Sequence, residues 1–230
     1  MSAWEQIMNG FDFSALTDLL FSAVPALLCV TLHELSHGYV AYLLGDNTAK
    51  DAGRLTLNPL KHIDPMGLLL LLVAHVGWAK PVPVRMQYFR DPKRGMALTA
   101  LAGPVSNLLI TVVFLFLYGL AFPFAAKNGS NLALSGAQLL LVTAHLSLGL
   151  GLFNLLPIPP LDGSKVLFSL LPDEKYYVLM RYERYGMLLL FALASLGVTG
   201  RVLSGAINAV FHLLWPVAEQ GTALTLNYLM

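Results

Sequence analysis

The side chains best suited to chemistry in this sequence are those of His33, Glu34 and His37, which form a His-Glu-x-x-His motif. Residues four apart lie on one face of a helix, so both imidazoles can bind the same zinc ion. The glutamate between them then stands beside the open coordination position, where a general base is needed. A motif this short also arises by chance on solvated helices, so its surroundings decide between the two interpretations.

The motif lies within residues 19–44, which form one long and mostly apolar run. A solvated helix face would not carry such a run. Ionisable side chains are costly in a membrane-spanning helix, and where they occur they usually mark function. We therefore expect the motif to bind zinc inside a spanning helix.

Composition points to an integral membrane protein. Of the 230 residues, 57% are hydrophobic and only 12% are charged, whereas soluble domains carry about 25% charged residues. We expect a single domain over residues 1–230, with a core at about 19–170. The formal net charge of +1 gives no reason to expect a nucleic-acid partner. No basic segment or small-residue cleavage site precedes the first apolar run, so we expect that run to remain in the protein.

The basic residues predict the topology. Eight of the fourteen Lys and Arg residues fall between Lys50 and Arg94, and four fall between Lys165 and Arg184. Basic loops remain on the cytoplasmic side of a membrane. Both stretches are therefore expected in the cytoplasm, with the N-terminus outside.

The apolar pattern predicts an all-α polytopic protein whose core is three membrane-spanning helices. We place these helices at about residues 19–44, 96–122 and 138–156, with a small outer loop at 123–137. Residues 186–217 are apolar but contain Gly197 and Gly200. They form either a C-terminal hairpin of two short helices or one long kinked helix.

A shorter apolar stretch at residues 66–78 has too few residues to cross the hydrocarbon core, which needs about twenty. Lys61 and Lys80 flank it, so we expect a re-entrant segment that enters and leaves on the cytoplasmic side; a tilted short span is the alternative. Residues 54–57 alternate in polarity and suggest a short strand.

Catalytic zinc usually has three protein ligands, and Asp162 is our candidate for the third. It follows the third apolar run in the proline-rich segment Pro157-Ile158-Pro159-Pro160-Leu161-Asp162-Gly163, which suits a ligand on irregular backbone. The alternative role is an N-cap for the next helix. Four other aspartates lie in polar loops and are most simply solvated: Asp46, Asp51, Asp64 and Asp91.

Several remaining residues have two interpretations each. Cys29, the single cysteine, excludes an intramolecular disulfide and lies one turn before His33; it either neighbours the metal or, more simply, packs. His145 either orients a ligand or makes a packing hydrogen bond, and His75 is a candidate for the substrate entrance. His62 and His212 suggest no special role.

The sequence resembles the site-2 protease family of intramembrane zinc metalloproteases, peptidase family M50. The resemblance rests on three blocks in the family's order. They are His33-Glu34-x-x-His37, Gly103-Pro104-Val105-Ser106-Asn107, and the run from Asn154 through Pro157 and Pro160 to Asp162-Gly163. Residues 77–84 look like the glycine-to-proline stretch of small bacterial members. The chain has no room for a PDZ or CBS domain, so it resembles the minimal branch.

The resemblance implies roles for five residues. His33, His37 and Asp162 would bind one zinc ion, Glu34 would activate a zinc-bound water as general base, and Asn154 would stand near the scissile carbonyl. Asn154 has an interhelical hydrogen bond as its alternative role. For Asn107 we expect helix packing behind Gly103.

The expected function is cleavage of a membrane-embedded substrate helix near the cytoplasmic face, in a bacterial inner membrane. Such a substrate must unwind locally, and residues 80–84 offer an extended edge for pairing. Two other classes remain open: a zinc transporter, which has no need of a base between its ligands, and an inactive relative that only binds membrane partners. The sequence leaves the physiological substrate and the oligomeric state undetermined.

Overall fold

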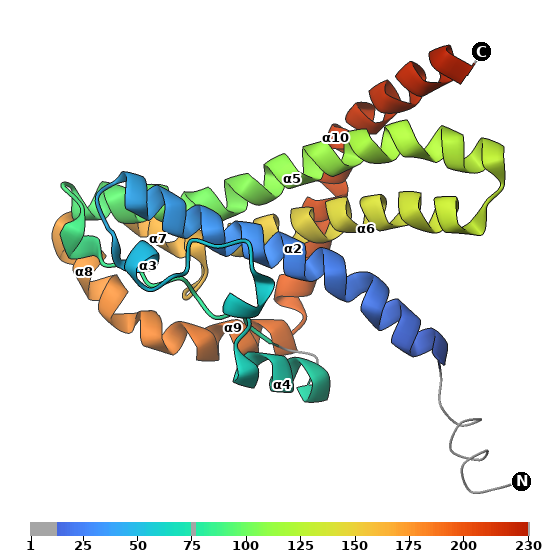
Figure 1. The fold of residues 1–230 in the computed structure, drawn as a ribbon. Coiled ribbons are helices and arrows are strands. Elements are labelled where there is room, and N and C mark those ends of the chain that lie inside the picture. The colour runs from blue at the N-terminus through green and yellow to red at the C-terminus, as the bar shows by residue number, and fades with distance from the viewer. Residues whose placement is uncertain (1–12, 75–76, 230) are drawn as a thin grey trace, which may run out of the picture.

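Four long helices form the frame of the protein (Figure 1). The computed structural model describes residues 13–74 and 77–229. The long helices are α2 (Phe13–Leu43), α5 (Pro92–Asn128), α6 (Asn131–Asn154) and α10 (Val198–Leu229). Among the described residues, α5, α6 and α10 are long and apolar enough to cross a membrane. This confirms the prediction of an all-α integral membrane protein.

Helix α5 is the central element, because it packs against α2, α6 and α10. It begins where the Asp91 side chain accepts a hydrogen bond from the Arg94 N–H, and Pro92 occupies its first turn, as proline favours. It ends at Gly129, whose φ of +62° is left-handed. Only two residues then separate α5 from α6, so the outer loop predicted at residues 123–137 is wrong. Pro123 lies inside α5, where it is buried and does not end the helix.

The C-terminal segment is two helices rather than one long kinked helix, although only the first of them is short. Helix α9 (Gly186–Ser195) is short, and α10 follows after Gly197, which has a φ of +70°. Helix α10 continues beyond the predicted end at residue 217 and crosses α5 closely (Figure 1). A Cβ at Gly119 would lie 2.0 Å from the carbonyl oxygen of Ala218. The backbones of α5 and α10 therefore touch, as small residues allow in membrane proteins.

The segment between α2 and α5 is short helices and loops. The residues predicted as a strand, 54–57, form bends rather than a strand, so that prediction is wrong. The Thr56 N–H bonds within the turn to the carbonyl of Arg54 and is therefore unavailable for a ladder. The helical elements of this segment are α3 (Thr48–Asp51), η1 (Pro59–Lys61), α4 (Pro65–Ala74) and η2 (Met86–Tyr88).

The two flanks of α4 lie side by side. Ile63 and Ala79 form an isolated antiparallel β-bridge. The Lys80 N–H donates to the carbonyl of His62 over 2.9 Å, and the Arg54 guanidinium donates to the carbonyl of Lys80 over 2.7 Å. This is the arrangement that a re-entrant segment requires, because a spanning helix would place its flanks at opposite faces of the bilayer.

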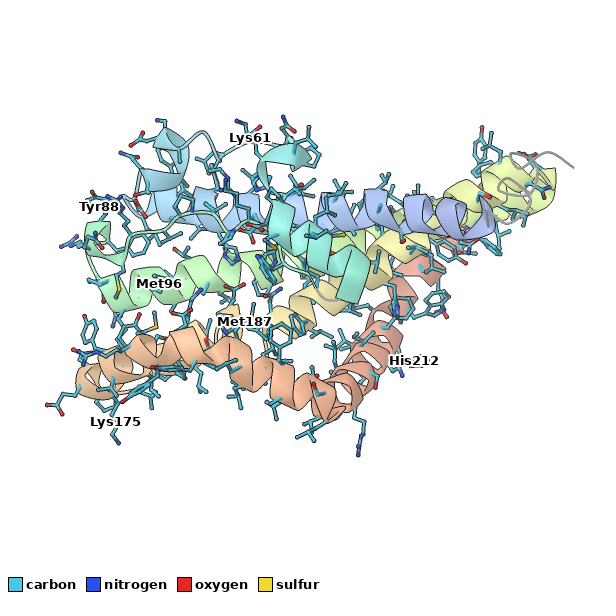
Figure 2. The ribbon with its side chains drawn as sticks, turned by 90° about the horizontal axis from the view of Figure 1, so that it is seen from below. Lys61, Tyr88, Met96, Lys175, Met187 and His212 are labelled. Atoms are coloured by element: carbon cyan, nitrogen blue, oxygen red, sulfur yellow. The ribbon has the colours of Figure 1, made fainter. Side chains whose placement is uncertain are left out.

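We predict that both flanks of α4 are reached from the same side of the membrane. Single cysteines replacing Lys61 and Lys80, both exposed (Figure 2 labels Lys61), should show the same response to a membrane-impermeant thiol reagent added to intact cells. The background is Cys29→Ala, which removes the only native thiol. Labelling of one position and protection of the other would mean that α4 spans the bilayer.

Candidate metal centre

Helix α2 and the start of α7 (Asp162–Ser169) bring three ligand atoms to one point. The Nε2 atoms of His33 and His37 lie 3.0 Å apart. The Oδ2 atom of Asp162 lies 3.2 Å from the first and 3.1 Å from the second. His33 and Asp162 are at most 9% exposed. The structure therefore assembles the three residues that the sequence proposed as ligands.

The geometry and the chemistry of this cluster fit zinc. Tetrahedral zinc with nitrogen and oxygen ligands has bonds of about 2.0–2.1 Å, so neighbouring ligand atoms lie about 3.3 Å apart. The three separations here are 3.0–3.2 Å. Two imidazole nitrogens and a carboxylate oxygen that converge in a buried place repel one another through their lone pairs. A divalent cation held by these three atoms would turn that repulsion into coordination.

Hydrogen bonds behind the histidines select the tautomer that zinc needs. Nδ1 of His33 lies 3.1 Å from Oδ1 of Asn107, and Nδ1 of His37 lies 2.7 Å from the carbonyl oxygen of Thr99. With these acceptors, each Nδ1 carries the hydrogen and each Nε2 presents its lone pair. Such partners fix the ring orientation of metal-binding histidines.

Asn107 contacts His33, which the sequence did not predict, because we expected Asn107 only to pack. It is fully buried, and its amide also donates to the carbonyl of Ser147 on α6 over 3.2 Å. Its packing role is real, but the same side chain holds His33. The available signal was a lone asparagine inside an apolar span, which is costly without a purpose.

Gly103 allows α5 to approach the histidine pair. A Cβ at this position would lie 2.4 Å from Nε2 of His37 and 2.6 Å from Cε1 of His33. Gly103 and Asn107 lie one turn apart on the same face of α5. The helix thus comes close at one residue and supplies the acceptor for His33 at the next turn.

Asp162 is the first residue of α7 and points at the histidines. The N-cap residue is Leu161, and no side chain caps the helix there, so the alternative N-cap role is wrong. Its Oδ2 atom lies 3.1–3.2 Å from the two Nε2 atoms, and a carboxylate oxygen is a common zinc ligand beside histidine nitrogens. The Asp162 side chain is therefore placed as the third candidate ligand.

Gly163 brings the Asp162 loop back against the end of α6. A Cβ there would lie 2.2 Å from the carbonyl oxygen of Leu155. The second Asp162 oxygen, Oδ1, faces Nζ of Lys165 at 3.9 Å. Both contacts restrict how the carboxylate is presented.

The two predicted catalytic residues lie in different surroundings. Oε2 of Glu34 accepts a hydrogen bond from the Val82 N–H over 2.8 Å. Asn154 ends α6, and its amide donates to the carbonyl of Leu150, one turn back in its own helix, over 3.0 Å. The role of Asn154 near a scissile carbonyl stays a prediction.

Among the described residues, Cys29, His62, His145 and His212 are not part of the cluster. Cys29 is buried, with its Sγ 3.8 Å from the carbonyl oxygen of Thr143, which fits the packing role. The ring of His145 lies 5.3 Å from that of Phe211 on α10. His212 is exposed on α10 (Figure 2). His75 lies outside the described residues.

One aspartate expected to be solvated is not. Asp46 is fully buried, and it accepts hydrogen bonds from the N–H groups of Thr48 and Arg85 over 2.9 and 2.6 Å. Asp64 and Asp91 accept backbone N–H groups at the starts of α4 and α5, and Asp51 is exposed. None of the four belongs to the metal cluster found among the described residues.

We predict that the purified protein holds about one zinc ion per chain, as a single three-ligand site requires. His33→Ala, His37→Ala and Asp162→Ala should each lower the zinc content, measured by elemental mass spectrometry. His145→Ala is the matched control and should retain it. A wild-type zinc content in Asp162→Ala would show that the third ligand is another residue.

We also predict that Asn107→Leu weakens zinc binding by about 10–100-fold, the usual cost of losing a partner that orients a metal-binding histidine. Competition with a chelator measures this affinity without reference to activity. Ser147→Ala is the control, because it removes the hydrogen bond from Ser147 Oγ to the Asn107 carbonyl and leaves Oδ1 in place for His33. Equal affinity in Asn107→Leu and the wild type would contradict the role of Asn107.

Comparison with known proteins indicates the family of the chain. The model of "Peptidase family M50" matches residues 21–196. "Putative zinc metalloprotease YwhC" of Bacillus subtilis is 38% identical over 202 residues, which cover 88% of this chain and 92% of that protein. "Putative zinc metalloprotease Rip2" of Mycolicibacterium smegmatis is 36% identical over 172 residues, 73% of this chain and 63% of that protein.

A comparison with solved structures found no match. The family model nevertheless covers most of the sequence, including all three residues of the metal cluster. The relative from Bacillus subtilis, which has a similar length and is 38% identical to this chain, points to the same family. The chain belongs to peptidase family M50.

Proposed function

We propose that this member of peptidase family M50 is a zinc metalloprotease that cuts membrane-embedded substrate helices near the cytoplasmic face. The observation that carries the proposal is the buried cluster of His33, His37 and Asp162 within a helical bundle, with Glu34 beside it in the sequence. The names of the relatives point to the same chemistry. The membrane-spanning helices around the cluster support a substrate that lies in the bilayer.

The residues of the site would have separate roles in the reaction. His33, His37 and Asp162 would hold zinc, which supplies Lewis acidity for attack by water on a peptide carbonyl. Glu34 would accept the proton of the attacking water and later give it to the leaving amine. Asn107 and the Thr99 carbonyl keep the histidines in the required tautomer.

The depth of the site supports a substrate in the membrane. His33 lies ten residues before the end of α2 at Leu43, which corresponds to about 15 Å of helix. A peptide bond must come to that depth to be cut. A substrate helix protects its peptide bonds with its own hydrogen bonds, so it must unwind first.

An unwound substrate could pair as an added strand with the extended residues 80–84. They pass next to Glu34, since the Val82 N–H contacts its carboxylate. Pro81 and Pro83 keep this segment extended but lack N–H groups. An added substrate strand would therefore depend mainly on carbonyl acceptors of the segment.

The charge distribution supports the cytoplasmic orientation. The loops between α2 and α5, together with α7 and α8 (Asp173–Tyr182), lie at the end of the bundle away from the α5–α6 turn (Figure 1). These segments carry most of the basic residues, and basic loops favour the cytoplasm. In a bacterium this membrane would be the inner membrane.

We predict that Glu34→Gln retains folding and zinc but loses cleavage of a single-span substrate, because it removes the base and keeps the size of the side chain. General-base catalysis contributes roughly 10²–10⁴-fold, and the rate of product formation, with cut sites mapped by mass spectrometry, measures the loss. Turnover at the wild-type rate would refute the mechanism. A wild-type protein that binds zinc and cuts no membrane substrate would instead favour a transporter or a binding protein.

A further inference from the structure

Residues 80–85, here called the strap, are tied down at both ends. At one end, the Lys80 N–H donates to the carbonyl of His62 and the Lys80 carbonyl accepts from Arg54. At the other end, the Arg85 N–H donates to Oδ2 of the buried Asp46 over 2.6 Å. The strap is thus fixed to the segment that follows α2 on both sides of its centre.

The centre of the strap contacts the proposed base. The Val82 N–H donates to Oε2 of Glu34 over 2.8 Å. The residues on either side, Pro81 and Pro83, have no N–H, so Val82 carries the only backbone donor of the three. Proline also restricts the backbone, which limits how far this one donor can turn away. The sequence of the strap therefore presents a single N–H to Glu34.

The side chain of Val82 packs against α2 at Gly38. Gly38 lies four residues after Glu34, hence on the same face of the helix. A Cβ at Gly38 would lie 3.0 Å from Cγ1 of Val82 and 2.7 Å from Cδ2 of Leu55. Val82 is 8% exposed. The missing side chain at Gly38 is what lets the strap lie close enough for its N–H to reach Glu34.

We propose that Val82 is a positioning residue for the proposed function: its N–H holds one oxygen of Glu34, so that the other oxygen is free to take a proton. A glutamate side chain has three rotatable bonds and would otherwise sample many orientations. A general base acts only within hydrogen-bond reach of its proton, and small misplacements cost much of the rate. The inference rests on Glu34 being the base.

The direct test replaces the amide at Val82 with an ester, by incorporating the hydroxy-acid analogue of valine into the full chain. This removes one N–H and keeps the side chain. A hydrogen bond to a charged group contributes about 1.5–3 kcal/mol, so we expect kcat to fall roughly 10–100-fold. KM and zinc content should remain as in the wild type. The control is the same replacement at Val84, which leaves the Val82 N–H in place.

A second test displaces the strap by adding a side chain at Gly38, where Val82 packs against α2. Gly38→Ala should lower kcat without loss of zinc, because the added methyl group collides with Val82 and Leu55. Adding Val82→Ala removes the collision with Val82 and keeps the N–H. The double variant should therefore recover part of the activity. A double variant no more active than Gly38→Ala would show that the strap does not carry the effect.

The two proposals fail in different ways. If the wild-type protein cuts no membrane substrate, the proposed function is wrong. If the wild type cuts and Glu34→Gln does not, but the Val82 ester turns over normally, the function stands and the role of Val82 is wrong. A loss of zinc in the ester variant would also contradict that role, because it would mean that the strap supports the metal cluster rather than the base.

Discussion

Two histidine nitrogens and a carboxylate oxygen are held 3.0–3.2 Å from one another inside an apolar bundle, and the rest of the structure depends on that constraint. Two come from α2 and the third from Asp162, far along the chain. Lone pairs at such short range repel one another, and burial removes the water that would screen them. The fold must therefore impose the cluster from outside, through elements that cannot shift. Zinc bound by these three residues would turn the repulsion into coordination.

Helix α5 supplies most of that rigidity, although it contributes no ligand. Thr99, Gly103 and Asn107 form one face that meets the histidines, by two hydrogen bonds and one close approach. Toward its other end, Gly119 brings the helix against α10, and the Thr225 hydroxyl donates to the carbonyl of Leu120. These contacts use glycine and backbone carbonyls, which pack closely without a hydrophobic driving force. A helix held on both sides in this way keeps the orientation of the rings.

The sequence predicted which three residues come together better than it predicted the residues that hold them there, for a physical reason. The spacing of His33 and His37 is local, so helix geometry alone places them together, and Asp162 followed from chemistry and from a family pattern. The hydrogen-bond partners of Asn107 and Asp46 depend on which helix or loop packs against them. The spacing of residues along the sequence does not show which element that is. The same limit explains the strand wrongly expected at residues 54–57, because alternation marks a strand only where a neighbour can pair with it. The outer loop predicted at residues 123–137 was too long, because α5 continues through the buried Pro123 to Asn128.

The pairing of the two flanks of α4 also decides where Glu34 finds its hydrogen-bond donor. Because residues 63 and 79 pair, the chain leaves α4 at the level where it entered, and the strap follows immediately beside α2. Were α4 to cross the bilayer, the strap would begin about 30 Å away, on the other face of the hydrocarbon core. Val82 could then not reach Glu34, and the buried carboxylate of Asp46 would lose its bond to Arg85. A re-entrant α4 would account for two otherwise unrelated observations. The Glu34 carboxylate has a backbone donor at Val82, and the buried Asp46 carboxylate has backbone donors at Thr48 and Arg85.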